Sequence, residues 1–343
     1  MQIDNGKIIR QSNFELLRLV SMLFIVYYHL VGWFVYGYEC WEHKALFLPL
    51  HIGVICFVLI SGYFGIKPSF KGLFRFVGMF FVLCLPEIIY NCIEATSFKG
   101  LFHSCLFISH THYWFVRTYL ALYLLSPLIN AFNEKVTNKQ KWLMFGVLCL
   151  ISMYMGNIWR YPIYEDGKNV INFLCIYQFG HMLAGTQSRW KEFAYWKLLL
   201  MYVLLNVVMV VGFYSLADTL SGEILWLLSF PYNSPLLMVN AIMFFMLFGK
   251  MSFASTKINS LAKGVFAIYI IHCNIPFAQN FEKHVIDILY QHITCFPLFI
   301  LTLLLMAIVV VFLCLFIYWM LTPIWKCLDK LAVLLTTKYS FLQ

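Results

Sequence analysis

Long apolar stretches recur along almost the whole chain, and this feature restricts its fold more than any other. A helix needs about 20 mostly apolar residues to cross the hydrocarbon core of a membrane. Such stretches lie at residues 14–36, 45–66, 72–94, 113–133, 142–159, 170–188, 195–216, 233–249, 262–281 and 295–322. They predict an all-α integral membrane protein with about ten transmembrane helices, which together form one domain over residues 1–343. Residues 219–232 are predicted to be an interfacial or re-entrant segment beside the short stretch 233–249.

The composition excludes several classes of protein. Of the 343 residues, 62% are hydrophobic and 11% are charged, whereas soluble domains average about 45–50% apolar and about 25% charged residues. So much apolar surface cannot be hidden from water, so a soluble globular protein and a disordered chain are both excluded. The net charge is +9. In a membrane protein an excess of basic residues usually reflects which connecting segments face the cytoplasm, so we expect no nucleic-acid partner.

The basic residues alternate between the connecting segments. Of the 24 Lys and Arg residues, 17 lie in the N-terminal segment and in every second segment after it. By the positive-inside rule these segments face the cytoplasm, which places both termini there and requires an even number of spans. We therefore expect a multi-pass protein of the inner or plasma membrane.

The first predicted helix carries ionisable residues inside its apolar run. Arg18 and His29 are eleven positions apart, so at about 100° per residue they share one helix face, about 16 Å apart along the axis. This puts Arg18 near the cytoplasmic boundary and His29 beyond the middle of the membrane. Glu15 precedes Arg18 by three residues and can pair with it. A charged residue inside a membrane usually marks a functional site. The alternative is structural: the Arg18 side chain would extend to the lipid headgroups, and His29 would form a hydrogen bond with a neighbouring helix.

Several segments carry a family resemblance. The run from Glu15 to Arg18, followed by His29, resembles the opening motif of the acyltransferase-3 family of bacterial membrane proteins. The likeness continues, in the family's order, at residues 57–64 (FVLISGYF), 113–115 (YWF), 119–130 (YLALYLLSPLIN) and 266–272 (FAIYIIH). The resemblance implies ten spans and transfer of an acyl group, usually acetyl from acetyl-CoA, to a hydroxyl of a cell-envelope glycan.

One departure concerns the cytoplasmic start of the third predicted helix. Where the family often has two arginines spaced RxxR, this chain has Lys67, Lys71 and Arg75. The positive charge is kept, but the bidentate geometry is not, because lysine binds phosphate as a point charge. These residues are candidates for attracting the nucleotide phosphates of acyl-CoA, and ordinary positive-inside topology is the alternative.

Acyl transfer to an alcohol needs a base for the hydroxyl proton and a donor for the developing oxyanion. His29 is the residue of its helix that can act as a base near neutral pH, so we expect it to be the general base. A covalent acyl-histidine is a variant of this role. Arg18 cannot be a base; we expect it to bind the CoA pyrophosphate or to pair with Glu15.

Further candidates lie on other predicted helices. His272 could orient His29, bond the acyl carbonyl or only pack. His51, a candidate for substrate binding, lies in the outer third of the second predicted helix, at about the predicted depth of His29. Glu87 lies inside the third predicted helix and needs a partner or a proton.

The remaining candidates concern the substrates. Trp114 suits an interfacial anchor or a sugar platform, and Arg117 an anionic glycan. Ser61, beside Gly62, suits either close helix packing or an acyl tunnel. We predict no bound metal and no permanently bound cofactor, since a solvated loop accounts best for the histidines at 103, 110 and 112.

Two other functions compete with acyl transfer. A transporter or flippase of a lipid-linked sugar would line its pathway with the buried charges and would show an internal repeat with broken helices. The two halves show no repeat, and only the stretch 231–235 resembles a break. A non-catalytic scaffold would bind no acyl-CoA. The acyl-transfer hypothesis implies three partners: acyl-CoA, a glycan or lipid-linked saccharide, and the lipid bilayer. It leaves the oligomeric state open.

Overall fold

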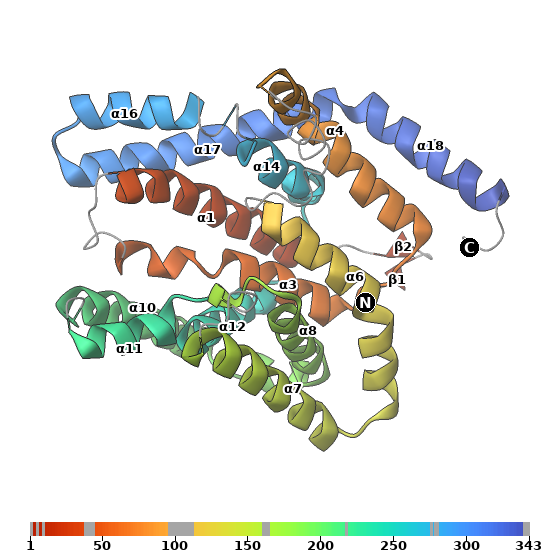
Figure 1. The fold of residues 1–343 in the computed structure, drawn as a ribbon. Helices are drawn as coiled ribbons and strands as arrows, with labels where there is room; N and C mark the ends of the chain where they lie inside the picture. The colour runs from red at the N-terminus through yellow and green to blue at the C-terminus, as the bar shows by residue number, and fades with distance from the viewer. Residues whose placement is uncertain are drawn as a thin grey trace. The chain divides into compact units, whose positions relative to one another are not determined.

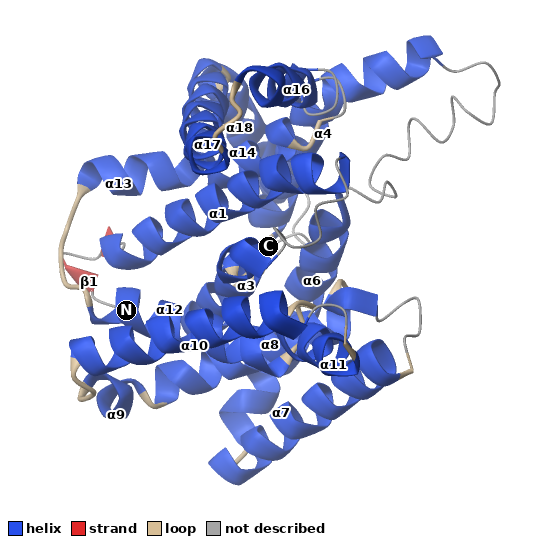
Figure 2. Cartoon of the chain, turned by 90° about the vertical axis from the view of Figure 1, so that its left-hand side faces the viewer, coloured by secondary structure: helices blue, strands red, loops and turns tan. Residues whose placement is uncertain are grey.

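The computed structural model is helical nearly throughout its described part, as Figure 2 shows. The structure describes residues 3–4, 7–8, 11–37, 45–94, 113–159, 165–216, 219–274, 277 and 281–338. The histidines at 103, 110 and 112 lie outside these ranges. The chain divides into two compact units. The first unit comprises Met1–Tyr28, Val35–Ile66 and Thr118–Ala262, and the second comprises His29–Phe34, Lys67–Arg117 and Lys263–Gln343.

The first unit is built mainly from apolar helices. They are α1 (Ser12–Gly37, which continues into the second unit), η1 (Ala45–Leu50), α3 (Gly53–Phe64), α6 (Trp114–Lys135, which begins in the second unit), α7 (Asn138–Met153), η4 (Tyr154–Ile158), η5 (Glu165–Gly167), α8 (Val170–Gly185), α9 (Gln187–Lys191), α10 (Tyr195–Leu216), α11 (Leu220–Ser229), α12 (Pro235–Lys250) and α13 (Thr256–Leu261). Two short antiparallel strands, β1 (Ile3–Asp4) and β2 (Lys7–Ile8), precede them, with Ile3 opposite Ile8.

The closest packing in the first unit is between α3 and α8. A Cβ atom on Gly62 of α3 would collide with the carbonyl oxygen of Tyr177 on α8, and one on Gly180 with that of Leu59. Small residues let helix backbones approach, which is how helices associate where water provides no hydrophobic drive. Elsewhere in the unit α10 contacts both α11 and α12 (Figure 1). Asn206 of α10 and Asn240 of α12 exchange two amide hydrogen bonds of 2.9 Å.

The second unit gathers helices from both ends of the chain. They are α4 (Phe70–Glu94), η6 (Ala262–Gly264, whose Ala262 is assigned to the first unit), α14 (Val265–His272), α16 (Lys283–His292), α17 (Phe296–Met320) and α18 (Thr322–Lys338). Helix α14 contacts α4 and α17, and α17 also contacts α16 and α18. Gly264 allows this approach, because a Cβ atom there would lie 2.6 Å from Leu315 and 2.9 Å from Tyr318.

The apolar helices support a membrane-embedded protein. Among the residues that the structure describes, five helices are long and apolar enough to cross a membrane: Ser12–Gly32, Phe70–Ile93, Trp114–Lys135, Tyr195–Leu216 and Phe296–Met320. Shorter apolar helices occupy Leu48–Phe64, Val170–Gly185 and Pro235–Lys250. The all-α class is confirmed. The number of ten spans and the cytoplasmic position of the termini stay predictions.

Several boundaries differ from the predicted ones. Within the predicted stretch 262–281, α14 ends at His272, so this residue lies at the end of a helix. The sequence supplies a reason, since Pro276 has no amide hydrogen to bond the carbonyl four residues earlier. Helices α16 and α18 were not predicted. Both are amphipathic, and a search for apolar stretches does not detect such helices.

Candidate active site

Two histidines from distant parts of the sequence meet in the second unit. His29 of α1 and His272 of α14 are joined by a hydrogen bond of 2.8 Å between His29 Nδ1 and His272 Nε2. Their ring centroids are 5.0 Å apart and the ring planes are tilted by 29°, so the two rings meet through these nitrogen atoms. His272 is buried and His29 is half-buried. The structure therefore brings together His29, the expected general base, and His272, for which the sequence left a catalytic or a packing role open.

A backbone carbonyl assigns the protons of this pair. His272 Nδ1 lies 2.8 Å from the carbonyl oxygen of Ile268, one helical turn earlier. A carbonyl only accepts, so Nδ1 of His272 must carry the proton and donate. In neutral His272 the Nε2 atom then accepts from His29, whose Nδ1 is the donor. It follows that neutral His29 carries its lone pair on Nε2, the nitrogen remote from His272.

Aromatic rings and a thiol surround the pair. The ring of Tyr269 lies 6.1 Å from that of His272, and Phe115 of α6 lies 5.5 Å from Tyr269. The Cys273 sulfur is 3.6 Å from His272 Nε2 and 3.9 Å from His29 Nδ1. Cys273 was not a predicted site residue, and its position directly after His272 is the signal for it in the sequence.

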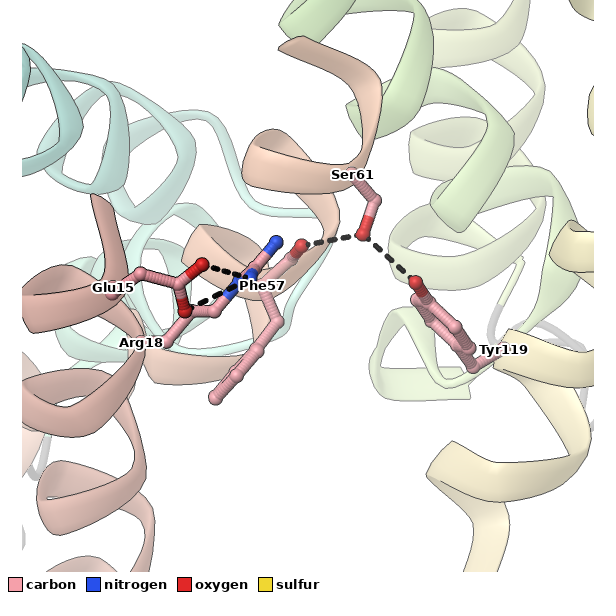
Figure 3. Close-up of polar contacts among 5 residues, drawn as sticks. All are labelled: Glu15, Arg18, Phe57, Ser61 and Tyr119. Carbon is pink, nitrogen blue, oxygen red and sulfur yellow. Dashed lines mark hydrogen bonds and ion pairs between the residues drawn. The ribbon is translucent and has the colours of Figure 1, made fainter. Parts of the chain in front are cut away.

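A second polar group belongs to the first unit (Figure 3). Nη1 of Arg18 donates to both carboxylate oxygens of Glu15, at 3.1 Å each, so the expected pairing of these residues is present. Glu15 is buried, whereas about a third of the Arg18 side chain, 33%, is exposed. This geometry fixes one edge of the guanidinium and leaves part of the cation accessible from outside the protein.

Ser61 and Tyr119 continue this polar group. The Ser61 hydroxyl donates to the carbonyl oxygen of Phe57 at 2.9 Å and lies 3.0 Å from the Tyr119 hydroxyl (Figure 3). Tyr119 is also within electrostatic range of Arg18. Tyr119 was not a predicted site residue, although it begins the segment 119–130 that carries part of the resemblance. Its hydroxyl is the signal that sequence analysis could have used.

Other residues of the resemblance are structural. Nδ2 of Asn130 donates to the carbonyl of Ile66 at 2.8 Å, and the Tyr177 hydroxyl donates to Oδ1 of Asn130 at 2.8 Å. The same hydroxyl accepts from the Ile66 amide at 2.9 Å. These three bonds hold the chain just after α3 against α6 and α8, and so hold Ser61 in its position.

The predicted nucleotide-binding cations have different surroundings. Lys67 and Lys71 are exposed. Nη1 of Arg75 donates to both carboxylate oxygens of Asp329 on α18, at 3.2 and 3.0 Å. The structure thus pairs Arg75 with a carboxylate, while the two lysines keep their ammonium groups in a solvent-accessible position.

The remaining candidates lie apart from these groups. His51 is buried in the turn before α3, where its ring stacks on Tyr232 at 4.3 Å and on Phe230 at 4.7 Å. This surrounding indicates packing. Trp114 packs its ring edge-on against Phe115 at the start of α6, and Arg117, one turn later, is exposed.

Glu87 has a partner that the sequence could not identify. It is fully buried in α4 and accepts a 2.6 Å hydrogen bond from the Tyr113 hydroxyl. A buried carboxyl needs such a donor, because an unsatisfied one loses its hydration without compensation. The bond therefore explains how the membrane-embedded part of α4 tolerates an acidic residue.

Comparison with known proteins identifies the family of the chain. A family model described as an acyltransferase domain matches residues 11–319. This range includes both histidines, the Arg18 group and the lysines, and it spans most of the chain. No curated protein and no solved structure matches the chain. Because the match covers far more than half of its length, the chain belongs to the acyltransferase-3 family and is a membrane acyltransferase.

Proposed function

We propose that the protein transfers an acyl group, acetyl from acetyl-CoA, to a hydroxyl of a cell-surface or lipid-linked polysaccharide. The family supports acyl transfer. The observation that carries the mechanism is the pair of hydrogen bonds that links the Ile268 carbonyl to His272 and His272 to His29. These hydrogen bonds orient the His29 ring and place the lone pair of the neutral ring on Nε2. A general base needs both features.

His29 Nε2 removes the hydroxyl proton as the acceptor oxygen attacks the thioester carbonyl. The imidazolium formed on His29 keeps its Nδ1–H bonded to His272 Nε2, and a hydrogen bond to a charged group is stronger than a neutral one. When the tetrahedral intermediate collapses, the carbon–sulfur bond breaks. His29 Nε2–H then returns its proton to the CoA thiolate, and the product ester forms. His272 acts through His29 and is a positioning residue.

Arg18 is proposed to bind a phosphate of the acyl-CoA. A guanidinium presents five N–H donors, of which Glu15 engages those of Nη1. A CoA pyrophosphate can use the remaining donors of the partly exposed side chain. The exposed lysines at 67 and 71 would raise the local concentration of the anionic substrate at the cytoplasmic face. We propose that this face is the side of acyl-CoA entry.

The test measures incorporation of labelled acetate into envelope polysaccharide by cells producing the full chain. His29→Ala is expected to lower incorporation by about 10²–10⁴-fold, the usual contribution of a general base. His284→Ala removes an exposed histidine from α16 and serves as the matched control. Unchanged incorporation in His29→Ala would show that His29 is not the base.

A binding measurement separates loss of chemistry from loss of fold. Calorimetric titration of the purified protein with acetyl-CoA should give the same affinity for His29→Ala as for the unchanged chain. Arg18→Gln should weaken this affinity, because the guanidinium donors are lost while the side chain stays polar. Absence of any heat with the unchanged chain would exclude acetyl-CoA as the donor.

A further inference from the structure

Three metal-binding atoms converge at the end of α14. His29 Nδ1, His272 Nε2 and Cys273 Sγ all lie within 4.8 Å of one another. Their separations are 2.8 Å between the nitrogens, 3.6 Å from the sulfur to His272 and 3.9 Å from the sulfur to His29. Two imidazoles and a thiolate are a common donor set for zinc and for other first-row transition metals.

The triangle has nearly the size that a zinc ion requires. With Zn–N bonds of about 2.0–2.1 Å and Zn–S bonds of about 2.3 Å, a tetrahedral ion places two nitrogens about 3.3 Å apart and a nitrogen and a sulfur about 3.5 Å apart. Both sulfur separations lie within about half an ångström of that value. The nitrogens need to part by about half an ångström, which replaces their hydrogen bond by two bonds to the metal.

The surroundings also suit a cation. The Ile268 carbonyl already holds Nδ1–H of His272, which aims the Nε2 lone pair into the triangle. Ligating histidines usually have such an outer partner. The carboxyl groups of Glu87 and Glu282 lie within electrostatic range of Cys273, so a dication there would favour the ionised form of each. His29 and Cys273 are only half-buried, which leaves room for a fourth ligand such as water.

We propose that the protein binds one zinc ion through His29 Nδ1, His272 Nε2 and Cys273 Sγ, and that this ion reversibly inhibits acyl transfer. Binding releases one proton, from the thiol, and oxidises nothing. The metal replaces the proton on His29 Nδ1, and Nε2 takes up a proton in exchange, so that the ring stays neutral. That nitrogen has lost the lone pair needed to accept the hydroxyl proton. The inhibition rests on the proposed function, whereas the binding does not.

Metal binding is tested on the full chain, purified in detergent and stripped with a chelator. Co²⁺ serves as the spectroscopic probe because a cobalt–thiolate bond gives a charge-transfer absorption band. We expect one equivalent of Co²⁺ to produce the band and one equivalent of Zn²⁺ to remove it. Cys273→Ser should abolish the band, and Cys327→Ser, which alters an exposed cysteine on α18, should retain it.

The same samples give zinc affinities by competition with a chelator of known strength. Cys273→Ser should weaken zinc binding by more than about 100-fold, since even outer-shell substitutions cost about 10–100-fold. A band that does not saturate, or one that persists in Cys273→Ser, would overturn the proposed site.

The activity measurement compares each variant with and without zinc. In the unchanged chain zinc should lower acetyl transfer by more than about ten-fold, and chelator should restore it. In Cys273→Ser this ratio should fall towards one at the same zinc concentration. Zinc bound at full occupancy with an unchanged rate would overturn the inhibition.

The two proposals fail in distinguishable ways. Transfer that depends on His29 but no cobalt or zinc binding would refute the metal site alone. A saturable band lost in Cys273→Ser, without acetyl transfer in the chelated protein, would refute the proposed function and leave the site established.

Discussion

At the scale of single residues, one backbone carbonyl decides which ring nitrogen of His29 carries the lone pair. The Ile268 carbonyl accepts a hydrogen bond from Nδ1–H of His272, so His272 Nε2 accepts from His29 Nδ1–H across the 2.8 Å bond between the rings. The sequence predicted a role for both histidines but left three roles open for His272. Contact between residues 243 positions apart depends on how α1 and α14 pack, and no local pattern records it.

The first prediction concerns His272 as a positioning residue. His272→Ala should lower the rate constant for acetyl transfer by about 10–100-fold, because a hydrogen bond to a charged group contributes about 1.5–3 kcal/mol. The KM for acetyl-CoA should change little, since this residue is not proposed to touch the nucleotide. Steady-state kinetics on purified protein measure both constants.

Two variants make this prediction specific. His272→Gln retains an oxygen that can accept from His29 Nδ1–H, so it should recover part of the lost rate. His284→Ala should be neutral. Equal activity in His272→Ala and the unchanged chain would contradict the role, as would a loss confined to KM.

At the scale of the helices, the apolar stretches predicted the long helices well. An apolar run of about 20 residues in lipid must satisfy its backbone hydrogen bonds internally, and an α-helix does so. α10 occupies 195–216 and α17 occupies 296–320, against predictions of 195–216 and 295–322. The amphipathic helices α16 and α18 were not predicted. Their polar faces interrupt the apolar signal, and a partner face in the fold is what stabilises them.

The second prediction concerns the contact between α3 and α8. Gly62→Ala should prevent correct folding or strongly lower the melting temperature, because its Cβ atom would overlap the Tyr177 carbonyl oxygen and backbone atoms cannot rotate away. Gly146→Ala on α7 is the matched control, since a Cβ atom there meets no atom of the described residues within 4 Å. Thermal unfolding in detergent measures both variants. Equal melting temperatures for the two would show that the helices separate easily.

The third prediction uses Glu282, in the connection that precedes α16. Its carboxyl is fully buried, accepts no hydrogen bond among the described residues, and has its pKa raised by burial from 4.5 to about 8. Between these values the folded chain holds a proton that the unfolded chain has lost. The contribution of Glu282 to stability is therefore fully present below pH 4.5 and decreases as the pH rises to about 8.

Melting curves at several pH values test this dependence. The melting temperature should fall by a few degrees between about pH 5 and about pH 8. Glu282→Gln should remove most of that fall, because the amide stays neutral. Glu192→Gln alters an exposed, hydrated carboxyl and should leave it intact. The same pH dependence in all three proteins would show that Glu282 does not cause it.

At the scale of the whole molecule, the distribution of basic residues predicts the topology. Two exposed cysteines provide a test within the natural chain, Cys295 before α17 and Cys327 on α18. The predicted sidedness places Cys295 outside the cell and Cys327 in the cytoplasm. A membrane-impermeant maleimide should label Cys295 in intact cells and Cys327 only after permeabilisation, as read by peptide mass spectrometry. The reverse pattern would invert the topology.

The sequence by itself determined that the chain is an α-helical membrane protein with a resemblance to acyltransferases. Backbone groups in lipid must satisfy one another, and this requirement acts on each apolar stretch separately. Only the tertiary structure decided which side chains meet: His29 with His272, Glu87 with Tyr113, and Arg75 with Asp329. Each of these bonds joins different helices, so it depends on helix packing, which residues throughout the chain determine together.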